Sequence, residues 1–468
     1  MSALTRRAWL AGLGLVTASA AGALGYRAWR DREPAAPPAR NEAGALVWRN
    51  WSGVAHAYPQ ARAAPASEGE LAALLRTAHA PIRAVGAGHS FTALAATQGT
   101  LLSLDRLTGL VSHDAATHEA VVRAGTRLGD LGPALSAIGQ EMANLPDINR
   151  QTLAGAMATG THGTGQGLRA LHGEALSLRI VTPRGDIIDC DTMTNAGLYQ
   201  CARVGLGAFG IVTQARLRNK ALTRIRKRVA LVALEEAYEQ WPALVAAHRN
   251  AEMYVIPFTG LAATIVADET DDPVRPRGPD QDSAFLMALK GLRDWLGWSA
   301  SARRAAAQAL LANTPAEEAV DEGWRLLSND RPHRFNEMEY HLPADAQIAA
   351  LREVMGAIET HRSDVFFPIE VRRIAPDEAW LSPFYQRESG SIAVHAYYKD
   401  DHQFFFDLIE PIFHRHDGRP HWGKLHSLRA PDLAGLYPRW REAMDVRREL
   451  DPDGRLLNDY LRGLLIDA

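Results

Sequence analysis

Apolar and polar residues along the first half of the chain follow short, alternating helix and strand patterns. Leucine and alanine recur at helical spacing behind Ser67-Glu68-Gly69-Glu70, a sequence typical of a helix start, and the run stops before Pro81. The pattern predicts a helix between these points, followed by a strand over residues 82–85. The same criteria predict these further elements: strands near 100–104, 110–113 and 119–124, a helix over 128–138, a hairpin over 176–189 and a strand ending at 217.

The second half, from about residue 221, combines longer strands with longer helices. The pattern there predicts strands over 229–232, 253–256, 263–267, 365–372 and 391–398, and helices over 235–248, 284–312 and 344–361. Residues 268–283 hold five Asp, one Glu, three Pro and one Gly, a composition typical of a surface loop. Strands and helices in this mixed order define an α+β protein with a second domain that begins near residue 221.

The length and charge of the chain narrow the class of protein. With 468 residues, the chain is long enough for two domains that each bury a hydrophobic core. Hydrophobic residues make up 47% and charged residues 22%, as in ordinary globular proteins. Because the net charge is only −3, we expect no nucleic-acid partner.

The N-terminal segment differs from the rest of the chain in charge. Residues 1–40 contain six Arg against two acidic residues, a net charge of +4, which leaves −7 for the remainder. Arg6-Arg7 precede a mildly apolar stretch over 8–26 that is rich in Ala and Gly. This arrangement is typical of a twin-arginine export signal over 1–33, followed by a proline-containing linker over 34–44. We expect a periplasmic protein exported by the twin-arginine machinery, or one anchored at the outer face of the inner membrane if the segment is not cleaved.

The two cysteines, Cys190 and Cys201, allow two interpretations. In an exported protein they can form a disulfide that closes a small loop. Alternatively, both are small buried side chains, as free cysteines usually are. No C-x-x-C motif and no His/Cys spacing suited to zinc occurs, so the sequence predicts no metal site.

Two glycine-rich segments of the first half carry the strongest chemical signal. Val85-Gly86-Ala87-Gly88-His89-Ser90-Phe91 follows an expected strand, and glycine lets backbone N–H groups approach a phosphate closely. The second segment, over 154–165, repeats Gly and Thr around His162. Two such loops in one domain suggest a long, dinucleotide-like cofactor. A nicotinamide-dependent dehydrogenase is disfavoured, because no G-x-G-x-x-G follows a strand with an acidic residue about 20 positions later.

The segments Gly86-Ala87-Gly88-His89-Ser90, 152–165 and 205–212 together resemble the FAD domain of the vanillyl-alcohol-oxidase superfamily. Within it, the chain is most similar to the sugar-1,4-lactone oxidases (gulonolactone and arabinonolactone oxidases) and the alditol oxidases. The resemblance covers nearly all of the chain after about residue 45, with several separated motifs in the family's order. It implies a two-domain fold of the vanillyl-alcohol-oxidase (PCMH) type: an FAD-binding domain over 45–220 and an α+β substrate domain over 221–468, whose C-terminal part returns to the flavin.

The resemblance also implies which residues hold FAD. His89 matches the histidine that commonly bonds the flavin's 8α-methyl carbon, so we expect covalently bound FAD. Alternatively, His89 only hydrogen-bonds a phosphate or the backbone, since histidine has many roles. The residues expected to bind FAD are Gly86, Ala87, Gly88, His89, Ser90, Phe91, Thr152, Gly155, Thr159, Gly160, Thr161, His162, Gly163, Gly210 and Ile211.

Three charged residues of the second half are expected to be catalytic. Glu370 and Arg372 lie two positions apart on an expected strand, so both side chains would face the same side. The pair matches the family's catalytic strand, and Lys424 matches a family cluster of rings and cations over 419–426. The alternatives are a solvated salt bridge and a solvated basic turn.

Four further residues are expected to contact the substrate: Thr152, His395, Tyr397 and His421. Related alditol oxidases carry a threonine near the position of Tyr397. A lactone or a cyclic sugar is therefore favoured over a polyol.

The resemblance implies an FAD-dependent oxidase that removes a hydride from a CH–OH group of a sugar, aldonolactone or polyol. The hydride passes to flavin N5, and O₂ then takes the electrons and becomes H₂O₂. Arg372 and Lys424 would stabilise the developing alkoxide, and Glu370 would accept hydrogen bonds or act as the base. The alternatives are a dehydrogenase of the same fold that reduces a quinone or cytochrome, and a non-catalytic exported carbohydrate-binding protein. The sequence leaves the substrate, the acceptor and the oligomeric state open.

Overall fold

The computed structural model describes residues 30–278, 282–311, 314–329 and 331–466. The expected twin-arginine signal lies outside the described residues, apart from its last few positions. Within the described ranges, none of the helices has the length and apolar character needed to cross a membrane.

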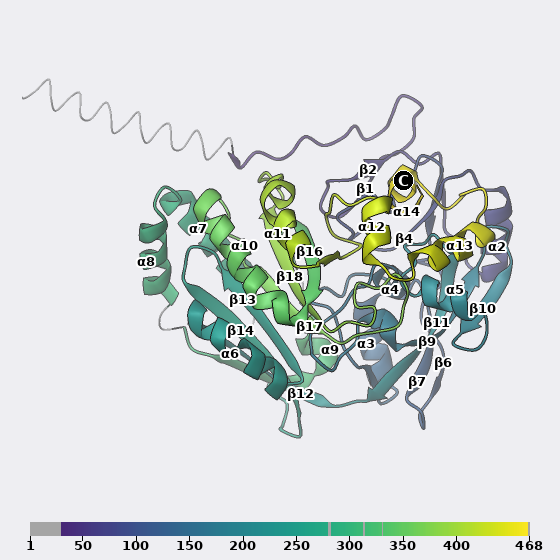
Figure 1. The fold of residues 1–468 in the computed structure, drawn as a ribbon. Coiled ribbons are helices and arrows are strands. Elements are labelled where there is room, and N and C mark those ends of the chain that lie inside the picture. The colour runs from purple at the N-terminus through teal and green to yellow at the C-terminus, as the bar shows by residue number, and fades with distance from the viewer. Residues whose placement is uncertain (1–29, 279–281, 312–313, 330, 467–468) are drawn as a thin grey trace, which may run out of the picture.

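An antiparallel sheet of six strands forms the centre of the first half (Figure 1). Its strand order is β10-β9-β11-β7-β6, and β8 pairs with the far end of β11. The strands are β6 (Leu110–Asp114), β7 (Glu119–Arg123), β8 (Gln140–Met142), β9 (Ala175–Val181), β10 (Ile187–Asp191) and β11 (Ile211–Ala221). Buried residues alternate along β11, so one of its faces packs into the core, as the period of two requires. The predicted hairpin is formed by β9 and β10.

A small parallel sheet carries the first glycine-rich turn. Its order is β3-β5-β4, formed by β3 (Ala61–Ala63), β4 (Ile82–Val85) and β5 (Thr100–Ser103). The predicted helix is α2 (Glu68–Thr77), and the Ser67 hydroxyl accepts from the Glu70 N–H at 3.1 Å. The Glu70 carboxylate accepts from the Ala66 N–H at 2.8 Å, so both groups of the motif satisfy backbone donors at the helix start. A two-stranded ribbon, β1 (Trp48–Arg49) with β2 (His56–Ala57), lies before this sheet.

Three short helices complete the first half: α3 (Leu128–Ser136), α4 (Leu153–Ala158) and α5 (Ala196–Ala202). Cys190 on β10 and Cys201 on α5 are both free and buried. The interpretation as small buried side chains is therefore confirmed, and the disulfide is wrong. Burial also raises the pKa of the Cys190 thiol to about 12, so this thiol stays protonated.

An antiparallel sheet of eight strands forms the second half, in the order β15-β12-β14-β13-β17-β18-β16-β19. Its strands are β12 (Arg224–Ala233), β13 (Asn250–Ile256), β14 (Leu261–Thr270), β15 (Glu317–Glu322), β16 (Phe335–Pro343), β17 (Ile369–Ile374), β18 (Ser389–Tyr397) and β19 (Arg419–Pro420). Helices α6 (Leu234–Ala247) and α10 (Gln347–His361) cover one face, where Met253, Val255 and Val371 enter the main hydrophobic core (Figure 1). The opposite face is therefore left to line a cavity.

The second half departs from the predicted elements in three places. The expected helix over 284–312 is two helices, α7 (Asp282–Leu296) and α8 (Ala300–Leu311). Gly297 ends the first helix, and the Ser299 hydroxyl accepts from the Ala302 N–H at the start of the second. The break between the helices is therefore explained by the local sequence. Strand β14 runs to Thr270, into the expected loop, and β17 begins only after Pro368. Strands β15 and β16 and the short helices α9 (Gly323–Leu326) and α11 (Glu410–Arg415) were not predicted.

The C-terminal segment packs against the first half (Figure 1). It contains α12 (Ala430–Leu436), α13 (Trp440–Leu450) and α14 (Asp459–Leu465). The Ile82 N–H donates to the Arg455 carbonyl at 2.8 Å, and the Asn458 amide donates to the carbonyls of Ala93 and Ala96. The chain changes from the first sheet to the second between Ala221 and Arg224, where the domain boundary was expected; the division into domains itself stays a prediction.

Candidate active site

A cavity of about 1010 Å³ is lined by residues of both halves of the molecule. The first half contributes both glycine-rich segments and the turn before β11. The second half contributes the open face of the eight-stranded sheet and the segment that carries Lys424. The cavity is at the upper end of the size range of ligand pockets, so it is large enough for a cofactor and a substrate together.

The first glycine-rich turn is in contact with two other segments of the chain. A Cβ at Gly86 would lie 2.3 Å from the Thr152 hydroxyl oxygen, so only glycine lets the two glycine-rich segments touch. The Gly88 residue has a positive φ of +68°, which also favours glycine. The Phe91 N–H donates to the Gly423 carbonyl at 2.7 Å, and the Ser90 hydroxyl donates to the same oxygen at 3.2 Å. These bonds bring the turn next to Lys424, more than 330 residues away in sequence.

His89 lies half-buried at the cavity wall. Its ring stacks on Trp51, with centroids 4.9 Å apart and an interplanar angle of 22°. Burial, assisted by the nearby cations Lys424, Arg127 and Arg150, lowers the pKa of His89 to about 4. The imidazole is therefore neutral at physiological pH, the state that a nucleophile requires.

The second glycine-rich segment begins with the short helix α4. The Thr152 hydroxyl accepts from the Gly155 N–H at 3.3 Å and so caps this helix while it faces the cavity. Gly155, Thr159, Thr161 and His162 also line the cavity. Gly160 and Gly163 do not: Gly160 has a φ of +78°, and a Cβ at Gly163 would lie 2.3 Å from the Leu145 carbonyl oxygen. Backbone geometry and packing therefore explain these two glycines, and their contact with FAD stays a prediction.

The turn before β11 lines the other end of the cavity. Gly207 and Gly210 have φ values of +68° and +112°, and a Cβ at Gly210 would lie 2.5 Å from Ile180 Cγ2. The buried Arg83 guanidinium donates to the Leu206 carbonyl at 2.6 Å and to the Gly207 carbonyl at 3.1 Å. Gly210 and Ile211 thus both face the cavity, where FAD contacts were expected.

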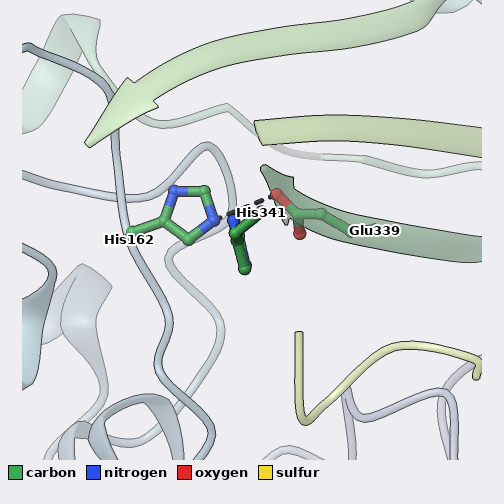
Figure 2. A group of neighbouring side chains, drawn as sticks. All are labelled: His162, Glu339 and His341. Carbon is green, nitrogen blue, oxygen red and sulfur yellow. Dashed lines mark hydrogen bonds and ion pairs between the residues drawn. The ribbon is translucent and has the colours of Figure 1, made fainter. Parts of the chain in front are cut away.

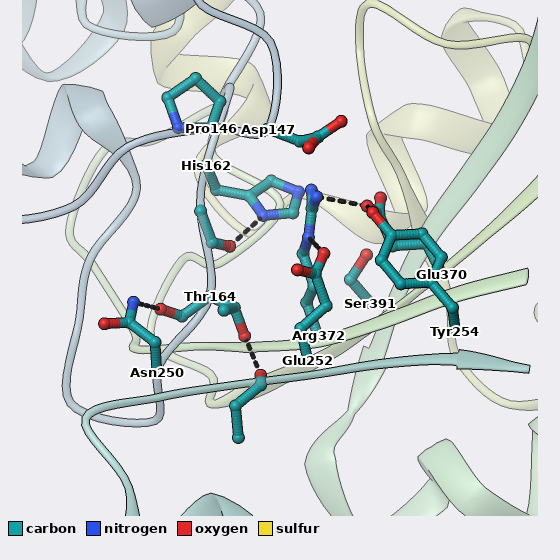
Figure 3. Close-up of polar contacts among 12 residues, drawn as sticks. Pro146, Asp147, His162, Thr164, Asn250, Glu252, Tyr254, Glu370, Arg372 and Ser391 are labelled. Carbon is teal, nitrogen blue, oxygen red and sulfur yellow. Dashed lines mark hydrogen bonds and ion pairs between the residues drawn. The ribbon is translucent and has the colours of Figure 1, made fainter. Parts of the chain in front are cut away.

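Glu370 and Arg372 face the same side of β17, as their spacing predicted (Figure 3). Arg372 donates through Nη2 to Glu370 Oε1 and through Nε to Glu252 Oε1, the latter at 2.6 Å. The Tyr254 hydroxyl also donates to Glu370 Oε1. The Arg372 guanidinium thus pairs with the buried Glu370 and the half-buried Glu252. This arrangement differs from the solvated salt bridge of the alternative interpretation.

The pKa of Glu370 is raised well above its ordinary value. Burial is the main cause, Arg372 opposes it, and the negative charges of Glu252 and Asp147 add to it. Tyr254 and Arg372 both donate to Oε1, and a hydrogen bond with the Glu252 carboxyl also raises the pKa. The surroundings of Glu370 therefore favour its protonated, neutral form.

Lys424 lies across the cavity in a second group of charges. Its ammonium forms an ion pair with Glu337, lies 3.9 Å from Glu339 Oε2, and stands 5.0 Å from the Phe91 ring centroid. Burial raises the pKa of Glu337, but Lys424 and His395 outweigh burial and hold it at about 2. Glu337, Glu370 and His395 place side-chain atoms within 4.8 Å of one another. Glu337 therefore joins the Lys424 group to the Glu370–Arg372 group.

Of the four expected substrate contacts, three line the cavity and one does not. His395 and His421 line the cavity, as does Thr152. His395 Nδ1 lies 2.9 Å from the Pro368 carbonyl, and His421 Nδ1 accepts from the Gly423 N–H at 3.0 Å. Tyr397 is not part of the cavity wall; its ring packs on Phe366 and Tyr398, with centroids 5.9 and 4.8 Å apart.

His162, Glu339 and His341 form a buried cluster beside the cavity (Figure 2). Each residue offers one possible metal-ligand atom, and these atoms lie within 4.8 Å of one another. The sequence analysis did not predict this grouping. Glu339 Oε1 lies 3.0 Å from His162 Nε2 and also accepts from the Ser391 hydroxyl. Burial raises the pKa of Glu339, but His162, His421 and Lys424 hold it well below its usual range. The carboxylate thus has its partners within the protein.

A bidentate ion pair closes the edge of the site nearest Arg372. Arg331 donates to both carboxylate oxygens of Asp147, at 2.8 and 3.0 Å. Burial raises the pKa of Asp147, but Arg331 outweighs burial and holds it below its usual range. This pair ties a loop of the first half to the second half, because Asp147 lies between β8 and α4.

Several residues of this site were missed by the sequence analysis: Trp51, Asp147, Glu252, Tyr254, Arg331, Glu337 and Glu339. For the residues on strands, the sequence pattern that could have predicted them is a polar side chain at every second position of an otherwise apolar strand. Glu252 and Tyr254 alternate with Met253 on β13 as Glu370 and Arg372 alternate with Val371 on β17, and β16 repeats the pattern.

The fold agrees with that of a solved oxidase structure. The crystal structure of cholesterol oxidase from B. sterolicum aligns with a TM-score of 0.72 and 15% identity, covering 93% of this chain and 100% of that one. At this identity the likeness concerns the fold alone, and it confirms the predicted PCMH-type architecture. An FAD binding domain matches residues 59–191. The protein is an FAD-dependent oxidoreductase.

The chain belongs to the D-arabinono-1,4-lactone oxidase family, which matches residues 215–464, more than half of its length. It is 33% identical to L-gulono-1,4-lactone dehydrogenase of Mycobacterium tuberculosis, over 90% of this chain and 99% of that protein. It is 28% identical to alditol oxidase of Streptomyces sp. and 26% identical to L-gulonolactone oxidase of Mus musculus, each over 89% of this chain and at least 97% of the relative. The predicted resemblance is confirmed, and the family is one of enzymes, which sets the non-catalytic alternative aside.

Proposed function

We propose that this enzyme oxidises a CH–OH group of a sugar lactone, a cyclic sugar or a polyol. The observation that carries the proposal is the meeting of three groups in one cavity: the glycine turn with His89, the Glu370–Arg372 pair and the Lys424–Glu337 pair. The names of the relatives support a sugar lactone or an alditol as the substrate class.

The cavity wall fits FAD. The turn over Gly86–Ser90 would hold the pyrophosphate, because its glycines bring backbone N–H groups to the surface of the wall. Thr152, Thr159 and Thr161 would supply hydroxyl groups along the ribityl chain, and Gly210 with Ile211 would face the adenine. When bound, FAD supplies the two-electron acceptor for the hydride.

The chain's own groups would prepare the substrate hydroxyl for hydride loss. Ionised Glu370 accepts the hydroxyl proton at Oε2, the oxygen left free by Tyr254 and Arg372. Arg372 and Lys424 are cations in a buried site, where they stabilise a developing alkoxide more strongly than water does. His395, His421 and the carboxylates of Glu337 and Glu339 bind further substrate hydroxyls.

The electron acceptor is proposed to be O₂. The alcohol loses a hydride and a proton; O₂ gains two electrons and two protons and becomes H₂O₂. A second candidate is a quinone or cytochrome acceptor, which is favoured by the name of the M. tuberculosis relative, a dehydrogenase.

The test is to mix the purified enzyme anaerobically with L-gulono-1,4-lactone, D-arabinono-1,4-lactone, xylitol or sorbitol and follow flavin absorbance. Bleaching by one of them supports the proposed substrate class, and bleaching by none of them contradicts it. Admission of air then separates the acceptors: H₂O₂ equal to the substrate consumed indicates an oxidase. Slow recolouring in air that ubiquinone or cytochrome c accelerates indicates the dehydrogenase.

We also propose that His89 is bonded to the flavin's 8α-methyl carbon. The bond would replace one methyl hydrogen and the imidazole N–H proton, and O₂ would take up the two protons and two electrons released and become H₂O₂. Two features support it: the neutral state of the ring and its place at the cavity wall. Acid precipitation of the wild-type protein should leave yellow colour in the pellet, and the His89→Ala pellet should be colourless. Yellow colour in the mutant pellet would rule out His89 as the link.

Export by the twin-arginine machinery to the periplasm remains a proposal. It is supported by Arg6-Arg7 and the apolar stretch that follows them. Cell fractionation checks it: the wild-type protein should be found in the periplasm or at the inner membrane, and an Arg6→Lys/Arg7→Lys variant should remain in the cytoplasm. An unchanged distribution of the variant would contradict the proposal.

A further inference from the structure

The open face of the eight-stranded sheet is charged on some strands and apolar on others. Strands β13, β17 and β16 present the charged residues of the candidate active site to the cavity. Strands β12 and β14 present only apolar side chains over their central part: Val229, Leu231, Ala263 and Ile265, all half-buried and all on the cavity wall. We call this wall, with Phe285 and Leu286 of α7, the apolar annex.

Strand pairing places the apolar annex directly beside the charged residues. Ile265 on β14 pairs with Glu252 on β13, and Glu252 pairs in turn with Arg372 on β17. On the other side, Val229 pairs with Ile265 and Leu231 with Ala263. Because strands lie about 4.8 Å apart, the annex extends over roughly 10 Å from β13 to β12.

Helix α7 contributes further apolar side chains to the wall of the same cavity. Phe285 and Leu286 line the cavity and pack against the main core. Polar groups border the annex on both sides. Glu252 pairs with Ile265, and Glu317 pairs with Val229. Lys227 also lines the cavity, and its ammonium donates to the Leu326 carbonyl at 2.9 Å.

A ligand that matches both parts of this sheet face has two chemically different parts. A sugar or lactone ring that binds between Arg372 and Lys424 covers the charged half of the sheet and leaves the apolar half in contact with water. Apolar walls of this size that remain open to a cavity are typical of ligand-binding grooves. The ligand that covers both halves carries hydroxyl groups at one end and an aliphatic chain at the other.

We propose that the apolar annex binds an aliphatic chain carried by the substrate, so that the enzyme prefers an acylated or alkylated sugar lactone or polyol to the unsubstituted sugar. The inference rests on the proposed function, because it assumes that the head of the substrate is oxidised at the Glu370–Arg372 end. The chain takes no part in the chemistry: it adds binding energy, and the same C–H bond breaks.

The first experiment uses the FAD-loaded enzyme and the most active lactone, together with its O-acetyl, O-butanoyl, O-hexanoyl and O-octanoyl esters. The apparent Kd from anaerobic flavin reduction should fall about two- to fourfold for each methylene added, until the annex is filled. Ile265→Asp charges the annex and Ala263→Trp fills it. In both variants the apparent Kd of the octanoyl ester should become about equal to that of the acetyl ester. Leu310→Asp, on the exposed side of α8, should keep the wild-type ratio.

A flat chain-length series, or a series that Ile265→Asp and Ala263→Trp both leave unchanged, would overturn the proposal. A chain-length dependence seen only when quinones with longer tails reoxidise the flavin would also overturn it, because the chain would then belong to the acceptor.

The second experiment needs no turnover, so it separates this inference from the proposed function. The fluorescent chain 11-(dansylamino)undecanoic acid should bind the FAD-loaded wild type and Leu310→Asp with a blue-shifted emission. Ile265→Asp and Ala263→Trp should weaken this binding at least tenfold. Binding with these losses supports the annex even if every sugar tested fails to reduce the flavin, whereas equal binding to all four proteins contradicts it.

Discussion

Glu370 shows how charges on an adjacent strand and on a distant loop determine the chemistry of one residue. Its pKa is raised by burial and by Glu252 and Asp147, and it is lowered by Arg372, with a net rise. Since the folded-state pKa of this acid exceeds its value in the unfolded chain, Glu370 stabilises the fold at low pH, and this contribution is lost as the pH rises through the folded-state pKa. The same rise makes the ionised form a stronger base.

Replacing Glu252 by Gln should move the pH dependence of activity to lower pH. The substitution removes a negative charge near Glu370 while Arg372 remains, so the pKa of Glu370 should fall. The ascending limb of kcat/KM against pH reports this pKa. Glu236→Gln, an exposed change on α6, is the control and should leave the limb in place. A limb that does not move in Glu252→Gln would exclude Glu370 as its origin.

Lys424→Met should lower the rate of flavin reduction by roughly 10²- to 10³-fold, the usual effect of removing one group that stabilises developing negative charge. The substitution also leaves Glu337 without the cation that holds its pKa at about 2. Stopped-flow absorbance measures the rate, and the ratio of flavin to protein should stay at the wild-type value. Lys399→Met, which breaks a 2.8 Å ion pair with Glu33 away from the cavity, is the matched control. Loss of flavin in Lys424→Met would assign the residue to cofactor binding instead.

The candidate catalytic residues could be predicted because their spacing is local. Glu370 and Arg372 are two positions apart on one strand, and the period of a strand puts them on one face. Their partners could not, because Glu252 is 120 residues from Arg372 and Glu337 is 87 residues from Lys424, and only the strand order brings them together. Tyr397 was expected at the site because it lies two positions from His395 on one strand. Its ring instead packs on Phe366 and Phe367, outside the cavity wall.

At the scale of elements, the sequence predicted best where the local signals agree. Helix α2 has a capping sequence at its start and Pro81 beyond its end, and the structure has it over Glu68–Thr77. Strand β16 was missed because its nine residues include Glu337, Glu339 and His341, which suggest an exposed segment, although almost all of them are buried. The carboxylates of Glu337 and Glu339 find their partners in His162, Ser391, His395 and Lys424, none of which is local in sequence.

Contact between the two glycine-rich segments leads to a prediction about Gly86. Ala at this position would bring its Cβ to 2.3 Å from the Thr152 hydroxyl and 3.1 Å from Thr152 Cβ. In a His89→Ala background, where FAD binding is reversible if the proposed link exists, Gly86→Ala should weaken FAD binding roughly ten- to a hundredfold. Fluorescence titration with FAD measures the change.

Two further variants define the origin of that effect. Adding Thr152→Ala to Gly86→Ala should restore part of the lost affinity, because the hydroxyl and methyl groups in the way are removed. Gly167→Ala, where a Cβ meets nothing within 4 Å, should leave FAD binding unchanged. An affinity that is unaffected by Gly86→Ala would show that the two segments move apart freely.

At the scale of the whole molecule, the cavity depends on segments from three distant parts of the chain. The first half supplies the glycine-rich loops, the eight-stranded sheet supplies the charged face, and the segment around Gly423 and Lys424 joins the two. Asp147 and Arg331 add an ion pair between the halves. Active-site geometry is therefore a property of the assembled molecule.

Arg455→Met should destabilise the protein by roughly 2 to 4 kcal/mol, since a charged donor leaves several carbonyls without a partner. The Arg455 guanidinium donates to the carbonyls of Leu75, Ala78 and Pro183, at 2.6 to 2.9 Å. A lower urea midpoint, measured by fluorescence, checks the loss. Arg448→Met, which removes an exposed ion pair with Asp445, should change the midpoint little. Equal midpoints for the two variants would show that the C-terminal contact adds no stability.

The same C-terminal contact can form only late in the synthesis of the chain. The strand and helix that Arg455 joins leave the ribosome more than 350 residues before Arg455 does. At 5–20 residues per second, that interval is roughly twenty to seventy seconds. During it, the Ile82 N–H and the carbonyls at the end of α2 have only water or a chaperone as partners. The nascent first half must therefore wait for the end of synthesis before its cofactor cradle is complete.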